Sequence, residues 1–111
     1  MSTRVEDKVV EGALTRKHIK ITSHDGQVDA ATVRVSKSVG DEVVWFSHDN
    51  KRAIIAFASA DGSPFEETHF HVPAGGSVCS GPAHRAAKTK AYKYTVVGHA
   101  GVNDPIIIIE H

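Results

Sequence analysis

The 111-residue sequence contains one cysteine, Cys79, and one methionine, Met1. A single cysteine cannot form a disulfide within the chain. Cysteine usage therefore does not indicate whether the protein works in a reducing or an oxidising compartment. Net charge is also absent, because 13 Lys and Arg residues balance 13 Asp and Glu residues. Without a basic stripe, the composition gives no reason to expect a nucleic-acid partner.

Long apolar runs are missing as well. No run approaches the roughly 20 residues that a membrane-spanning helix needs, so no membrane segment is expected. The first eight residues are polar and lack the apolar core of a signal peptide. We therefore expect a cytoplasmic protein if this N-terminus is the natural one, and a periplasmic or secreted protein if a leader has been removed.

The sequence contains a series of short segments in which apolar and polar residues alternate, separated by Gly, Pro and Asp turns. The late segment 91–99 places Tyr92, Tyr94 and Val96 on one face, which is typical of a half-buried strand. After Asp104-Pro105, the run 106–109 is apolar on both faces and β-branched, which favours a strand over a helix. Further strands are predicted over 18–22, 32–36, 43–47, 53–58, 68–72 and 77–80.

No segment has the pattern of an amphipathic helix, and 81–90 reads as a basic loop with room for one helical turn. The pattern predicts an all-β Greek-key sandwich or barrel of about seven to eight strands. Residues 1–16 are expected to form an arm or a first strand, and residues 17–111 a single domain.

Three motifs together resemble the cupredoxin family, the plastocyanin-like β-sandwich domains. The first follows Val33-x-Val35 and resembles the family's Gly-Asp turn and Val-x-Trp-x-Asn strand. The second stands in the place of the family's His-x-Val-x-Phe, and the third in the place of its Tyr-x-Tyr-x-Cys-x-x-His. In this chain they read Gly40-Asp41-x-Val43-x-Trp45-x-Ser47-x-Asp49, Ala53-x-Ile55-x-Phe57 and Tyr92-x-Tyr94-x-Val96-x-x-His99.

The departures from the family concern its copper site. A blue-copper centre needs a thiolate, two imidazoles and usually an axial thioether. Ala53 matches the first family His, Val96 matches the Cys, and only His99 is retained. Ser47 matches the Asn that braces the Cys loop, and it reaches less far. The resemblance therefore implies the family's fold without an intact blue-copper site, and no cofactor is expected at these positions.

Eight histidines suggest a second possibility, a Cu- or Zn-binding site. His69 and His71 share one face of a predicted strand, about 6 to 7 Å apart along the chain. His48 and His99 lie in loops that the resemblance would place at the same end of the sandwich, with Asp49 available to orient an imidazole. Solvent-exposed polar side chains are the simpler interpretation of all four histidines.

An enzyme is not predicted. Cys79 and His84 could form a nucleophile and base, but no orienting partner is visible, and a semi-buried structural cysteine is the simpler interpretation. The main hypothesis is a non-redox binding or structural module whose partner is a protein or a small molecule. The alternatives are a Cu/Zn-binding protein that uses the histidines, and an electron-transfer cupredoxin with an atypical site.

The only tryptophan, Trp45, marks the predicted core. It lies mid-strand, at a position where the resembled family buries an aromatic residue. We expect it to pack in the core with aromatic residues on the inward-facing sides of their own strands, namely Phe57, Phe70, Tyr92 and Tyr94.

Overall fold

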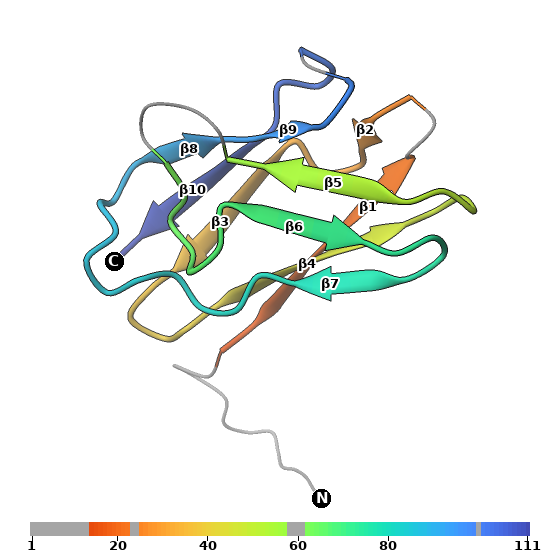
Figure 1. Ribbon diagram of the computed structural model, residues 1–111. Coiled ribbons are helices and arrows are strands. Elements are labelled where there is room, and N and C mark those ends of the chain that lie inside the picture. The colour runs from red at the N-terminus through yellow and green to blue at the C-terminus, as the bar shows by residue number, and fades with distance from the viewer. Residues whose placement is uncertain (1–13, 23–24, 58–61, 100) are drawn as a thin grey trace, which may run out of the picture.

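The computed structural model describes residues 14–22, 25–57, 62–99 and 101–111, which form two packed layers of β-strands (Figure 1). One layer is a four-stranded sheet in the order β2 (Gln27–Val28), β1 (Arg16–Thr22), β4 (Glu42–Ser47) and β7 (Ser77–Cys79). β1 and β4 run parallel, whereas β2 and β7 pair antiparallel with their neighbours. β4 is therefore a central strand of this sheet, with β1 on one side and β7 on the other.

The other layer consists of two three-stranded sheets. One has the order β6 (His69–Val72), β5 (Ala53–Ala56) and β9 (Thr95–Val96). The other has the order β3 (Thr32–Ser36), β10 (Ile106–Glu110) and β8 (Ala91–Lys93). β8 and β9 follow one another along the chain and are separated only by Tyr94, whose N–H donates to the Pro105 carbonyl at 3.1 Å.

The all-β sandwich expected from the sequence is confirmed. The described residues form ten strands rather than seven to eight, because β2 is an extra two-residue strand and the expected strand over 91–99 is split at Tyr94. They include no helix that could cross a membrane, and the loop over 81–90 contains turns only. The expectation of an arm or first strand over residues 1–16 falls almost entirely outside the described residues, since β1 begins at Arg16.

Trp45 lies at the centre of the core between the two layers, with no exposed surface. The centroid of its ring system lies 5.1 Å from Phe70, 5.6 Å from Tyr94 and 6.3 Å from Phe57, which confirms three of the predicted companions. Tyr92 is buried in the same core, but its hydroxyl turns toward the 81–90 loop and hydrogen-bonds the backbone of Lys88.

A further aromatic partner comes from a loop. Phe65 packs edge-on against Trp45, with centroids 6.4 Å apart and an interplanar angle of 90°. It lies between β5 and β6, next to the buried Pro64, so it has no strand alternation to mark it in the sequence. The core thus extends beyond the strands and includes Phe65.

A buried carboxylate ties the two layers together at the start of β4. Asp41 accepts the backbone N–H of Thr15 at 2.9 Å and that of Ser36 at 3.0 Å. These donors lie just before β1 and at the end of β3, which belong to different layers. The Gly-Asp turn visible in the sequence therefore has a structural role, because its carboxylate satisfies backbone groups of both sheets.

Two buried polar atoms in the aromatic core have no regular hydrogen bond within the described residues, the Trp45 Nε1 and the Tyr94 hydroxyl. Burial raises the pKa of Tyr94 to about 12, while the nearby indole N–H of Trp45 lowers it and the charge of Asp29 raises it. The neutral phenol is strongly preferred in the folded state because the low-dielectric core disfavours the phenolate.

Trp45→Ala is expected to unfold the domain or nearly unfold it. Truncation of a large buried aromatic residue costs about 3–5 kcal/mol, out of the roughly 5–15 kcal/mol that stabilise a typical domain. The matched control is His69→Ala combined with His71→Ala, since both side chains are exposed on β6. Urea unfolding should show a small change for the control, and an equal loss in both proteins would contradict the position of Trp45.

Tyr94→Phe is expected to change the pH dependence of stability. Because the folded-state pKa lies above the ordinary value of 10.0, the neutral phenol's contribution is complete below pH 10 and is lost as the pH rises toward 12. The loss should reach about 3 kcal/mol. Urea unfolding at pH 8 and pH 11.5 should therefore show a steeper decline for the wild type than for Tyr94→Phe. Parallel declines would mean that the phenol is accessible to solvent.

Candidate functional site

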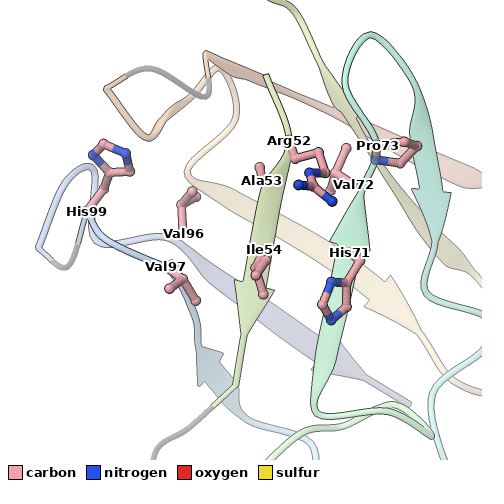
Figure 2. Close-up of a pocket in the computed structure, with 9 residues that line it drawn as sticks. All are labelled: Arg52, Ala53, Ile54, His71, Val72, Pro73, Val96, Val97 and His99. Atoms are coloured by element: carbon pink, nitrogen blue, oxygen red, sulfur yellow. The ribbon is translucent and has the colours of Figure 1, made fainter. Parts of the chain in front are cut away.

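The candidate site is an open depression of about 650 Å³ at one end of the sheet formed by β6, β5 and β9, where β5 begins and β6 and β9 end (Figure 2). Strand alternation turns Ile55 inward, whereas Ile54 lines the depression. Ile54 pairs with His71 on β6, and its carbonyl accepts the N–H of Val97 at 2.8 Å. One row of the sheet therefore runs from His71 through Ile54 to Val97.

The three positions at which the resemblance implies copper ligands converge on this depression. Ala53, Val96 and His99 all line it, although 43 residues separate the first two in the chain. Ala53 and Val96 are buried and offer only methyl groups, so the donor set does not fit a blue-copper centre. The fold has brought the ligand positions together, and the side chains present there form an alkyl floor.

The remaining histidine, His99, packs at the rim against the turn between β1 and β2. Gly26 has a positive φ of 76°, and a Cβ added there would lie 2.2 Å from His99 Cβ and 2.4 Å from His99 Cγ. Only glycine therefore fits at position 26. In Figure 2 the imidazole of His99 lies to one side of Ala53 and Val96, away from β6.

Ser47 performs a different role from the bracing Asn that it matches. It is buried at the end of β4, and its hydroxyl lies within hydrogen-bond distance of the carbonyls of Asp49, at 2.7 Å, and Lys51, at 2.8 Å. A hydroxyl has one proton to donate, so it can serve one of these carbonyls at a time. Ser47 thus holds the β4–β5 loop, which leads directly into Arg52 at the edge of the depression.

The four histidines named as possible metal ligands do not form one cluster. His69 and His71 are exposed on β6, His48 is exposed in the β4–β5 loop, and His99 lies beyond β9. His71 and His99 line the same depression, but they lie on opposite sides of Ile54 and β5 (Figure 2). Within residues 14–22, 25–57, 62–99 and 101–111, no group of three His, Cys, Asp or Glu residues is placed to hold a metal ion.

Cys79 is exposed, so the expectation of a semi-buried structural cysteine is wrong. Its strand, β7, alternates with Val78 turned toward the core, which leaves the thiol on the outer face, where it donates to Glu42 Oε1 at 3.2 Å. His84 instead lies near Glu66, with Nδ1 3.9 Å from Oε1. The thiol and the imidazole therefore have different polar neighbours, which gives no support to a nucleophile–base pair.

The sequence analysis missed the residues that give the depression its charge and its exposed apolar surface, namely Arg52, Ile54 and Val97. No role was predicted for Arg52, although it directly precedes Ala53, which matches the first of the family's copper ligands. Val97 is 50% exposed, which is unusual for a large apolar side chain in this structure. The available signal was the alternation of 53–57, which turns Ile54 outward once Ala53 and Ile55 are placed inward.

Comparison with known proteins supports the fold. No family model matches the chain, and no curated protein matches it in sequence. Among solved structures it is similar to a Sinorhizobium pseudoazurin, with a TM-score of 0.59, 15% identity and coverage of 87% of this chain and 75% of the other. A purple cupredoxin from Nitrosopumilus maritimus matches with a TM-score of 0.60, 14% identity and coverage of 85% and 99%. An oxidized amicyanin variant matches with a TM-score of 0.59 and 15% identity, and the match covers 93% of this chain and 87% of the amicyanin.

Gly26→Ala is expected to destabilise the protein more than Gly40→Ala. Both glycines have a positive φ, 76° and 78°, so both substitutions incur the conformational cost of about 1 kcal/mol or more. A Cβ at position 40 would meet no atom within 4 Å, whereas at position 26 it would collide with His99. The additional loss for Gly26→Ala, measured by urea unfolding, should be accompanied by a shift of the His99 ring signals in NMR spectra. Equal losses would mean that the β1–β2 turn does not support His99.

Proposed function

Because the chain has a cupredoxin-like fold with alkyl groups at two of the ligand positions, we propose that it is a non-redox binding module. The observation that supports this most strongly is the convergence of Ala53 and Val96 on one open depression. A concave, mostly apolar surface with a few polar groups at its edge is the usual form of a binding site. Electron transfer through type 1 copper lacks the thiolate and one of the imidazoles that it requires. No catalytic role is proposed.

The depression matches this role in size and in composition. Its volume, about 650 Å³, lies within the roughly 300–1,000 Å³ typical of small-molecule pockets. Its floor is rigid, because Ala53, Val72 and Val96 are buried and belong to paired strands. Its edge consists of Arg52, His71, Pro73 and His99. A ligand would therefore meet an ordered alkyl surface bordered by hydrogen-bond donors.

A Cu/Zn-binding role for the histidines is less well supported. Two imidazoles on opposite sides of Ile54 do not make the four-coordinate site that Zn²⁺ prefers, and no third ligand among the described residues joins either of them. The spacing of His69 and His71 on one strand face remains compatible with weak metal binding at the surface.

Addition of Cu²⁺ to the wild-type protein should produce no intense thiolate-to-copper absorption band. In a Cys79→Ser background, Ala53→His with Val96→Cys should produce that band, because the two substitutions restore a His₂Cys donor set with His99. Ala53→His with Val96→Ser is the matched control, since it lacks only the thiolate.

A strong band in the wild-type protein would overturn the proposed function. Absence of the band in the restored variant, with an unfolding midpoint close to that of the wild type, would mean that positions 53, 96 and 99 do not have the geometry of a copper site. Tight Zn²⁺ binding that is lost in His69→Ala with His71→Ala would favour the histidine site instead.

A further inference from the structure

The polar side chains that line the depression all carry nitrogen groups. They are one guanidinium, from Arg52, and two imidazoles, from His71 and His99, and none of the described residues that line the depression carries a carboxylate. Arg52 is exposed and has no hydrogen bond or ion pair with any described residue. A permanently charged group at the edge of an apolar depression therefore lacks a counter-ion within the described part of the chain.

Other arginines in the structure show what a structural role looks like here. Arg16 Nε lies 3.0 Å from Glu42 Oε1, and Arg34 Nη1 lies 2.8 Å from Glu110 Oε2. Each of these pairs links neighbouring strands, β1 with β4 and β3 with β10. Arg52 has no such partner, although Asp49 lies three residues away, where its Oδ1 is 3.5 Å from the Ser47 hydroxyl. Its guanidinium is therefore available to a ligand.

The apolar part of the depression lies directly beside this charge. Figure 2 shows the Arg52 side chain between β5 and β6, next to Ala53 and Val72, with Ile54 and Val97 further along the same surface. Ile54 is partly exposed, and Val97 is 50% exposed, so both have apolar surface that a ligand can cover. The surface thus offers a positive end and an apolar end within one depression.

We propose that the depression binds a small organic anion, with its carboxylate on Arg52 and its apolar body over Ile54 and Val97. A guanidinium is suited to a carboxylate because its N–H groups can donate two parallel hydrogen bonds. Cover of the alkyl surface adds binding free energy in proportion to the apolar area removed from water. This inference rests on the proposed function, because it names the ligand class of the same site.

The test is an NMR titration of the ¹⁵N-labelled protein with three probes of equal length: hexanoate, hexan-1-ol and hexylammonium. Hexanoate should shift the amide signals of Ile54 and Val97 and should bind about tenfold or more tightly than hexan-1-ol, because a charge-assisted hydrogen bond contributes about 1.5–3 kcal/mol. Hexylammonium should bind least, since Arg52 repels it.

Substitutions then assign the two ends of the ligand. Arg52→Gln should weaken hexanoate binding about tenfold and leave hexan-1-ol unchanged, whereas Val97→Ser should weaken both. Arg34→Gln is the matched control, because it removes the same charge from β3, outside the depression, and should leave hexanoate binding unchanged.

The outcomes separate this inference from the proposed function. Equal binding of hexanoate and hexan-1-ol would overturn the anion preference and would leave a binding module for neutral apolar ligands. No shift at Ile54 or Val97 with any of the three probes would overturn the inference. The proposed function is judged separately by the copper titration.

Discussion

The structure depends on the packing of Trp45 between its two layers. Its indole contacts the rings of Phe57, just after β5, of Phe65 and of Phe70 on β6, and that of Tyr94 between β8 and β9. A single side chain of one layer therefore contacts several segments of the other. The contact has a cost, because Trp45 Nε1 and the Tyr94 hydroxyl are buried without a regular hydrogen bond in the described residues. The aromatic core holds β5 and β9 in place, and these strands carry Ala53 and Val96.

The same scaffold can therefore support different chemistry at its surface. Ala53 and Val96 belong to the core and pair with Val72 and Ile55 on neighbouring strands, so the strand ladder fixes their positions. Where a metal centre would need a thiolate and imidazoles, this chain places alkyl groups. A fold that keeps its shape without the metal can become a binding surface, and function then follows from the side chains at the site rather than from the fold.

Arg52 and His99 illustrate how the edge of the depression is built. Arg52 is positioned by the β4–β5 loop, in which the Ser47 hydroxyl contacts the Asp49 and Lys51 carbonyls. His99 is positioned by a close approach to Gly26, which lies 73 residues earlier in the chain. The alkyl floor comes from regular strands, whereas Arg52 and His99 depend on loops, and loops can vary their side chains without disturbing the ladder.

The sequence alone determined the all-β architecture, the burial of Trp45 and the absence of copper-donor side chains at positions 53 and 96, because strand alternation and side-chain chemistry are local properties. Only the tertiary structure decided that Arg52, His71 and His99 line one depression and that Cys79 faces solvent. It also decided that Phe65 belongs to the core and that Gly26 supports His99. These features depend on contacts between residues far apart in the chain, and a local sequence pattern cannot predict such contacts.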